Sequence, residues 1–314
     1  MKKSLRIRNW EAAHKIVREW EARSGGTISV EDAFEKFIAD CEARHLGEAS
    51  VAKYRLLSRE MRVRFGSRPV DGISVDDLGE YRKSWNLAGI SSQKKTERLR
   101  TFFRFCIDRG WADKNPASAL KLGRLKTVPT LPVTDEDFEK LVEATERFPK
   151  KGIYGERTGL RIKAFLLTLR YAGLRIRDCV MLRKSAVREG RVLLYSAKTG
   201  VPVHVPLPEF VIAALETAGN GGEYFFWSGA GKPKSAVADW QRSLSRLGEL
   251  AGIRFHAHQL RDSFAVGLLT KGIPVEDVAA LLGNSVKVCA QHYAPWVKIR
   301  QARLEEAVRR TFAA

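Results

Sequence analysis

The feature that most limits how this chain can fold is a basic segment with two prolines, residues 121–132. Proline fixes φ and has no backbone N–H, so a stretch of this kind ends regular structure. We therefore interpret residues 119–132 as an interdomain linker, and a chain of 314 residues is long enough for a domain on each side. The predicted parts are a basic N-terminal helix or arm (1–26), a helical domain (27–118), the linker, a second domain (133–296) and a C-terminal helix (297–314).

The first block is predicted to be helical throughout. Ser29 and Ser74 each precede acidic residues and are typical helix N-caps, because a hydroxyl can accept from the first free N–H groups. A further helix from about Ser92 would end at Gly110. Apolar residues at helical spacing are expected to form the core: Ala33, Phe34, Phe37, Ile38 and Cys41; Val51, Tyr54, Leu57 and Met61; Leu99, Phe102, Phe103 and Cys106.

The second block predicts helices with a small sheet. Thr134 is an expected N-cap, and an apolar helix over 160–171 would end at Gly173. Residues 191–195 and 201–205 are predicted as two strands, with a turn at 197–200 between them and a loop at 227–231. The expected fold is therefore mainly α with a small β-sheet (α+β).

Net charge predicts a polyanionic partner. Lys and Arg total 55 against 36 Asp and Glu, and the excess is shared, with 27 basic and 17 acidic residues in 1–130 and 28 and 19 in the rest. Neutralising phosphates releases condensed counterions, so a polyanion such as double-stranded DNA is the expected partner. Lys94, Lys95 and Arg98 share one face of the helix from Ser92. That face is either simply solvated or a DNA contact, and the charge of the whole chain favours DNA.

Cysteine usage and hydropathy point to a reducing compartment. The four cysteines show no CxxC pair and no zinc-type spacing with histidine, so we expect buried free thiols and no metal. No apolar h-region follows the basic N-terminus, and no run approaches the length of a membrane span. We expect a cytoplasmic protein with no membrane partner.

Two arginines are candidates for binding a phosphodiester. Arg175 follows Gly173, and Asp178 lies three residues further on, where its carboxylate could orient the guanidinium. The alternative is an ordinary surface pair. His258 and Arg261 are spaced i, i+3 on one face of a predicted helix. The alternative for this pair is a histidine that caps the helix and an arginine on the surface. His256 competes with His258 for the catalytic histidine role, but it lies five residues from Arg261 and not on the same face.

Tyr293 and Lys198 are the candidates for attack and proton donation. Forming a phenolate at pH 7 from a group with a pKa near 10 costs roughly 4 kcal/mol, so Tyr293 needs a neighbouring base or cationic clamp. His258 and the two arginines would supply these. Lys198 at a hairpin tip could protonate a leaving oxygen. The alternatives are a half-buried core tyrosine beside Trp296 and a solvated lysine.

The ordered motifs resemble the tyrosine recombinase (phage integrase) family from about residue 27 to the C-terminus, most specifically in the second block. The motifs are Ala172-Gly173-Leu174-Arg175, Lys198-Thr199-Gly200, His258-Gln259-Leu260-Arg261-Asp262-Ser263-Phe264-Ala265, Leu281-Leu282-Gly283-Asn284-Ser285 and His292-Tyr293.

The resemblance implies a role for each motif residue. Arg175 and Arg261 would bind the non-bridging oxygens of the scissile phosphate, and Lys198 would protonate the departing 5′ oxygen. His258 would assist proton transfer, and Tyr293 would form a 3′-phosphotyrosine bond. The family keeps the energy of the cut bond in that ester, so it needs neither metal nor ATP. The first block would be the core-binding domain and the second the catalytic domain, with the C-terminal helix either exchanged between protomers of a DNA-bound tetramer or packed within its own chain.

Three positions depart from the family pattern. Asn284 stands where the family usually has His or Trp donating to the phosphate, and the interval from Gly283 to Tyr293 is one residue shorter than the common pattern. Asp262 stands where histidine is common, at a position that need not touch phosphate. We predict an active enzyme, with Asn284 as the position where activity would be impaired.

The leading prediction is a site-specific DNA recombinase or integrase that cuts and rejoins DNA through a 3′-phosphotyrosine. The alternative is a catalytically weakened DNA-binding relative that serves as an accessory factor or regulator. A third interpretation is a type IB topoisomerase-like monomer, which the helix beyond the tyrosine disfavours.

Overall fold

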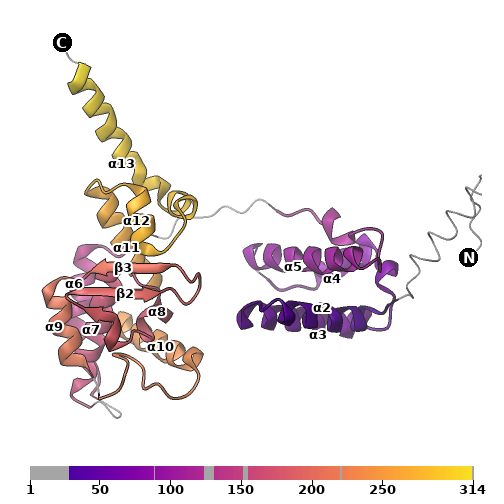
Figure 1. The fold of residues 1–314 in the computed structure, drawn as a ribbon, viewed down its shortest axis with the longest axis horizontal. Helices are drawn as coiled ribbons and strands as arrows, with labels where there is room; N and C mark the ends of the chain where they lie inside the picture. Colours follow the sequence, from indigo (N-terminus) through magenta and orange to yellow (C-terminus); the bar gives the residue numbers. More distant parts are fainter. Residues whose placement is uncertain (1–27, 88, 124–130, 151–154, 220, 313–314) are drawn as a thin grey trace, which may run out of the picture. The chain divides into compact units, whose positions relative to one another are not determined.

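The computed structural model describes residues 28–312 except 88, 124–130, 151–154 and 220, and it omits the side chains of 294–304 and 307. Residues 1–127 and 128–314 form two compact units, which are described separately (Figure 1). The predicted N-terminal helix or arm lies outside the described residues.

The described part of the N-terminal unit is entirely helical, as predicted. Ser29 Oγ accepts from Asp32 N (3.0 Å) and Ser74 Oγ accepts from Asp77 N (3.0 Å), so both expected N-caps are confirmed. α2 packs against α3 and α5, and Figure 1 shows α2 and α3 beside each other. The elements are α2 (Val30–Ala43), α3 (Glu48–Phe65), η1 (Val70–Gly72), α4 (Val75–Lys83), α5 (Gly89–Asp108) and η2 (Pro116–Ala119).

Stacked aromatic rings form the core of this unit. The rings of Phe34 and Phe102 lie parallel with centroids 3.6 Å apart, and Phe37 meets Phe102 edge-on at 5.7 Å. All three side chains are buried. The burial of these rings confirms the predicted apolar faces of α2 and α5.

The linker begins later than predicted. Leu120 is buried in the core of the N-terminal unit, and the Arg100 guanidinium donates to the carbonyl oxygens of Ala117 (3.1 Å) and Leu120 (2.7 Å). These bonds tie the segment after α5 back onto that helix. Arg82 Nη1 also donates to the carbonyl oxygen of Lys121 (2.6 Å), and Gln93 Nε2 to that of Gly123, so the chain stays bound to this unit beyond the predicted linker start at residue 119. Proline and charge content alone do not reveal this packing.

The C-terminal unit surrounds a small sheet with helices. Its elements are α6 (Asp135–Ala144), α7 (Arg157–Ala172), α8 (Ile176–Val180), η3 (Lys184–Ala186), β1 (Val187–Arg188), β2 (Arg191–Tyr195), β3 (Pro202–Pro206), α9 (Glu209–Ala218), α10 (Pro233–Ala251), α11 (Ala257–Thr270), α12 (Val275–Leu282) and α13 (Val286–Phe312). The observed fold, mostly helical with one three-stranded sheet, confirms the predicted class.

The sheet is antiparallel in the order β1-β2-β3. Val192 pairs with Val205 and Leu194 with Val203, so these four side chains share the face that packs on the core, whereas Leu193 and Tyr195 alternate to the other face and are exposed. β2 matches the prediction, whereas β3 is displaced by one residue. The two-residue β1 was missed, because so short a strand shows no alternation.

α7 is the central helix of this unit, and it begins three residues before the predicted start. Its Phe165 ring stacks on Trp240 of α10 at 4.0 Å, and the helix also packs against α9 and α11. Thr134 Oγ1 accepts from Asp137 N (3.1 Å), which confirms the predicted cap of α6.

α13 is one continuous helix that carries Tyr293 and runs on to Phe312 (Figure 1). The prediction of a separate C-terminal helix from residue 297 is therefore wrong in its start. Near its end the side chains of Val308 and Phe312 are exposed. Among the described residues, no helix combines the length and apolar character that crossing a membrane requires.

Candidate active site

The site begins at a glycine corner between α7 and α8. Gly173 ends α7 with a φ of +59°, and a Cβ there would lie 2.5 Å from Cδ1 of Phe264. Both the left-handed backbone and this close approach require glycine. The corner places Arg175 at the N-cap of α8, inside the fold rather than on the outer surface of a helix.

Arg175 joins two distant segments. Its Nη1 donates to Ser196 Oγ (2.7 Å) beside the β2–β3 turn, and its Nη2 donates to Asn284 Oδ1 (2.5 Å) in the α12–α13 corner. Asp178 Oδ2 lies 3.9 Å from Nη1. The guanidinium is thus held in one orientation by neutral acceptors, with a carboxylate slightly further away.

Asp178 is buried and binds the turn that carries Lys198. It accepts from Ala197 N (2.8 Å) and from Ser196 Oγ (3.4 Å), so the alternative of an ordinary surface pair with Arg175 is wrong. Lys198 follows Ala197 directly and is exposed at the tip of the β2–β3 turn. Asp178 therefore positions this turn relative to Arg175.

Arg261 is the most deeply placed of the candidate cations, with 2% of its surface exposed. Its Nη1 donates to the carbonyl oxygen of Gly173 (2.6 Å) and its Nη2 to that of Leu282 (2.7 Å). Burial, and after it the nearby charge of Arg175, lower the pKa of Arg261 to about 10. The alternative of a surface arginine is wrong.

His258 lies on the outer part of the same helix, with 56% of its side chain exposed. Its Nε2 is 3.7 Å from Asp262 Oδ1. Desolvation first, and then the positive charges around it, lower the pKa of His258 although Asp262 acts the other way. The N-cap of α11 is His256, not His258, which removes the capping alternative for His258.

Asn284 sits in a tight corner after α12. Gly283 has a φ of +59°, Gly283 N donates to Ala280 O (3.0 Å) and Asn284 N donates to Ala279 O (3.0 Å). A Cβ on Gly283 would lie 2.8 Å from Val203 Cγ2 on β3. With Oδ1 turned to Arg175, the amide nitrogen of Asn284 retains two N–H donors.

Tyr293 is buried, with 5% of its surface exposed, and its hydroxyl donates to Asp262 Oδ1 at 2.8 Å. Burial, together with the charge and the hydrogen bond of Asp262, raises the pKa of the phenol well above its usual value; Arg261 lowers it by less. The expectation that His258 and the arginines activate this phenol therefore does not describe this structure. The carboxylate that contacts the hydroxyl outweighs them.

Asp262 is the site residue that sequence reasoning missed. The motif pattern predicts no contact with phosphate for it, yet it is buried, accepts from the Tyr293 hydroxyl and lies 3.7 Å from His258 Nε2. Its place four residues after His258 on one helix was readable, but its contact with Tyr293 joins residues 31 positions apart. Spacing along the chain gives no signal for such a contact.

The contacts bring the second-block candidates together. Arg175 and Arg261 are close enough for the charge of one to lower the pKa of the other, and both lie within the network that holds Asn284, Tyr293 and the Lys198 turn. Two neighbouring guanidinium groups repel, and an anion bound between them would relieve that repulsion. Among the described residues, no group of three or more His, Cys, Asp or Glu side chains is placed to hold a metal ion.

The three basic candidates of α5 differ from one another in the N-terminal unit. Lys94 is exposed and lines one recess with Arg98. Lys95, with 12% of its side chain exposed, forms an ion pair with Glu60 and lies 4.9 and 4.5 Å from the ring centroids of Tyr81 and Trp85. All three side chains line that recess, which agrees with the predicted shared face, but Lys95 is the one that is paired with a carboxylate and packed on aromatic rings.

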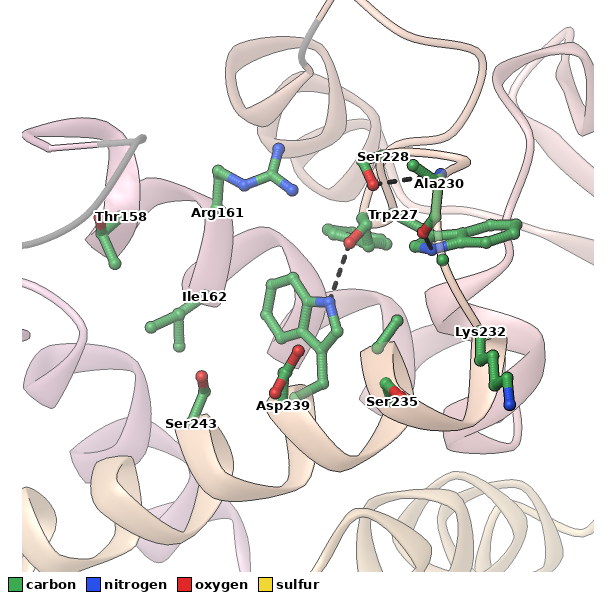
Figure 2. A pocket seen from close by; sticks show the side chains of 14 residues that line it. Thr158, Arg161, Ile162, Trp227, Ser228, Ala230, Lys232, Ser235, Asp239 and Ser243 are labelled. Carbon is green, nitrogen blue, oxygen red and sulfur yellow. Dashed lines mark hydrogen bonds between the residues drawn. The ribbon is translucent and has the colours of Figure 1, made fainter.

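A cavity of about 350 Å³ lies elsewhere in the C-terminal unit (Figure 2). It is lined by residues of α7, the 226–232 loop and α10, among them Arg161, Trp227 and Asp239. Trp240 Nε1 donates to Phe226 O (2.9 Å) at its wall. None of the candidate site residues lines it.

Comparisons with known proteins agree with this geometry. Residues 132–296 match the sequence model of the phage integrase family. The tyrosine recombinase XerD of Rhizobium meliloti (strain 1021) is 29% identical over 251 residues, covering 75% of this chain and 79% of that protein. A lambda integrase dimer bound to a COC′ core site has a TM-score of 0.69 at 18% identity, over 91% of this chain and 81% of that chain. A lambda integrase tetramer bound to a Holliday junction has a TM-score of 0.66 at 17% identity, over 91% of this chain and 85% of that chain. At such identities the solved structures establish the fold alone.

Proposed function

The chain belongs to the phage integrase family, and we propose that it cuts and rejoins DNA at specific sites through a 3′-phosphotyrosine intermediate. The observation that carries this proposal is the convergence of Arg175, Arg261, Asn284 and Tyr293 in one contact network. A buried guanidinium such as that of Arg261, with the partly buried Arg175 near it, is costly to maintain for packing alone. It suits a phosphodiester, which needs both a cationic clamp and a nucleophile.

Each residue has a defined part in the proposed reaction. Arg175 and Arg261 bind the non-bridging oxygens, and the Asn284 amide nitrogen donates to one of them. Tyr293 Oη attacks phosphorus while the bond from phosphorus to the 5′ oxygen breaks. Lys198 protonates that leaving oxygen, and His258 assists proton transfer. The ester keeps the energy of the broken bond, so rejoining needs neither metal nor ATP.

The N-terminal unit contributes non-specific affinity in this proposal. Lys94 and Arg98 line a recess on α5 and contact the phosphates of duplex DNA, whereas Lys95 stabilises the unit through Glu60. We assign this unit as the core-binding domain and residues 133–296 as the catalytic domain. The lambda integrase tetramer supports assembly of four protomers on DNA, with the exposed end of α13, at Val308 and Phe312, docking on a neighbouring protomer.

An accessory DNA-binding protein without strand transfer is the less favoured function. Asn284 was its main support, yet Asn284 holds Arg175 and keeps its N–H donors. A topoisomerase-like monomer is also less favoured, since α13 continues 19 residues beyond Tyr293.

The test starts from a pool of duplexes with a randomised centre, since the target site is not known. Protein and pool are incubated, covalent complexes are recovered by precipitation with dodecyl sulfate and potassium, and the DNA is sequenced. A second arm recovers DNA bound without a covalent link. We expect one family of sites in the covalent arm, and its loss with Tyr293→Phe while the binding arm is unchanged.

The outcomes separate the functions. Sites enriched only in the binding arm would identify an accessory factor. Covalent capture with no preferred sequence, together with relaxation of supercoiled plasmid by a monomer, would identify a topoisomerase. Covalent capture that persists in Tyr293→Phe would contradict the assigned nucleophile.

A further inference from the structure

Asp262 contacts the attacking atom of the proposed reaction, although no role described so far uses it. The Tyr293 hydroxyl donates to Asp262 Oδ1 at 2.8 Å, from α13 to α11. The Asp262 side chain is buried, at 6% exposure, and so is the tyrosine. A carboxylate is rarely kept in the interior without a partner, so this contact is a built part of the site rather than a surface encounter.

The chemistry requires a proton acceptor at this position. Forming the bond from oxygen to phosphorus expels the phenol proton, and a phenol with a raised pKa does not lose it unaided. The acceptor must lie within hydrogen-bond reach of Oη. Asp262 Oδ1 meets that condition, because it already accepts the hydrogen bond of the Tyr293 hydroxyl at 2.8 Å.

We propose that Asp262 is the catalytic residue that accepts the proton of Tyr293 during cleavage, with His258 as the next acceptor. As Oη bonds to phosphorus, its proton moves to Asp262 Oδ1, and the 5′ oxygen leaves with a proton from Lys198. His258 Nε2 lies 3.7 Å from Asp262 Oδ1, and its imidazole is more than half exposed, so it can release the proton to solvent. Rejoining reverses these transfers.

The surrounding charges fit this role. Arg261 on α11 lies near both Tyr293 and Asp262, so it stabilises negative charge on either oxygen during the transfer. Arg175 and Asp178 also act on Arg261, and Cys289 is the titratable neighbour of Tyr293 on its own helix. His256 and His292 face His258. This arrangement has the form of a nucleophile, a base that contacts it, and a third group beside the base.

The first experiment compares Asp262→Asn with the unaltered protein, and it rests on the proposed function. The substrate is a duplex recovered from the randomised pool and nicked beside the cut, so that cleavage is trapped. Asparagine keeps the size and the acceptor oxygen but is not a base. We expect cleavage slower by about 100-fold or more. We also expect its rate to rise about tenfold per pH unit from pH 6 to 9, where the unaltered protein changes little.

Two further measurements exclude a merely structural role. A fluorinated tyrosine at 293, with a more acidic phenol, should restore cleavage by Asp262→Asn much more than it accelerates the unaltered protein. A substrate with sulfur in place of the 5′ oxygen has a leaving group that needs no proton. It should rescue Lys198→Ala but not Asp262→Asn. If Asp262→Asn does not fold, the pair Asp262→Glu and Asp262→Gln, equal in size, gives the same comparison of base and amide.

Each result has one meaning. Cleavage by Asp262→Asn that equals or exceeds that of the unaltered protein, while the latter forms its covalent complex, overturns the role of Asp262 and leaves the proposed function standing. Rescue of Asp262→Asn by the sulfur substrate also overturns it, because the lost proton would then belong to the leaving group. Failure of the unaltered protein to form any covalent complex overturns the proposed function itself.

Discussion

The two units bury different kinds of side chain. In the described part of the N-terminal unit, the buried polar side chains are those of Ser58 and Thr96, which carry no charge. The described part of the C-terminal unit buries four charged ones: Arg161, Asp178, Arg261 and Asp262. Charge in an interior costs several kcal/mol unless it is paired and hydrogen-bonded. Three of these four, Asp178, Arg261 and Asp262, belong to the candidate site, whereas Arg161 donates to the carbonyl oxygen of Ala218 elsewhere in the unit (2.9 Å). Most of the buried charge in this unit therefore lies at the candidate site.

The cations of the N-terminal unit stay near solvent, where attraction to phosphate needs no desolvation. Lys94 is exposed, and the more covered Lys95 is neutralised by Glu60. The C-terminal unit instead removes water from Arg261 and covers most of Arg175, which would strengthen their attraction to a phosphate bound there. In the proposed function, cationic side chains thus attract DNA in the N-terminal unit and act on the scissile bond in the C-terminal unit.

Removing Arg261 should have the largest effect. Arg261→Ala leaves the carbonyl oxygens of Gly173 and Leu282 without their donors, so we expect the C-terminal unit to lose about 2–5 kcal/mol. Trapped cleavage should fall by about 100- to 1000-fold. The matched control is Arg68→Ala in the N-terminal unit, an exposed arginine bonded to Asp77, where both quantities should barely change. Equal losses in the two variants would contradict the contrast between the units.

Truncating a core side chain in the N-terminal unit should have the next largest effect. Phe102→Ala removes the ring stacked on Phe34 and should cost about 3–5 kcal/mol. In calorimetry the unfolding transition of the N-terminal unit should move to a lower temperature, while that of the C-terminal unit should not move. A single transition that moves as a whole would show that the two units unfold together.

A smaller effect is expected at the glycine corner. Gly173→Ala adds a Cβ against Phe264 in a left-handed backbone, so we expect a loss of about 1–3 kcal/mol in chemical denaturation and slower cleavage as Arg175 moves. Gly79→Ala is the control, since Gly79 lies within α4 with open space around it. That variant should gain about 0.4–1 kcal/mol. A stable, active Gly173→Ala protein would refute the requirement for glycine.

The smallest effect concerns Asn284. Asn284→Ala removes the acceptor of Arg175 and should slow trapped cleavage by about tenfold, with little change in melting temperature. Asn284→Asp keeps the acceptor but loses the N–H donors, so it separates the two uses of the amide. Faster cleavage by Asn284→His would support the expected impairment at this position, and slower cleavage would count against it.

Local chemistry made much of the fold predictable. The caps at Ser29, Ser74 and Thr134 and the stop at Gly173 depend on residues within one or two turns, and each was found where expected. The one-residue error in β3 and the late start of the linker have another origin. Both are set by contacts from elsewhere, such as those of Arg100 with Ala117 and Leu120.

The candidate site was predictable in composition but not in arrangement. The order of the motifs identified Arg175, His258, Arg261 and Tyr293, whereas the burial of Arg261 and the bond from Tyr293 to Asp262 required three-dimensional contacts. Residues 31 or 88 positions apart meet only when the helices pack. The same limit explains why Lys95, readable as a surface cation, is paired with Glu60.

The two carbonyl groups that accept from Arg261 also explain how its buried guanidinium charge is stabilised without a salt bridge. Gly173 and Leu282 lie at the C-terminal ends of α7 and α12, where aligned peptide dipoles leave roughly half a negative charge each. Among the described residues, no carboxylate lies within ion-pair distance of Arg261. Two helix macrodipoles thus balance its charge from behind while its remaining N–H groups stay available, so the arginine has no carboxylate to release when a phosphate arrives.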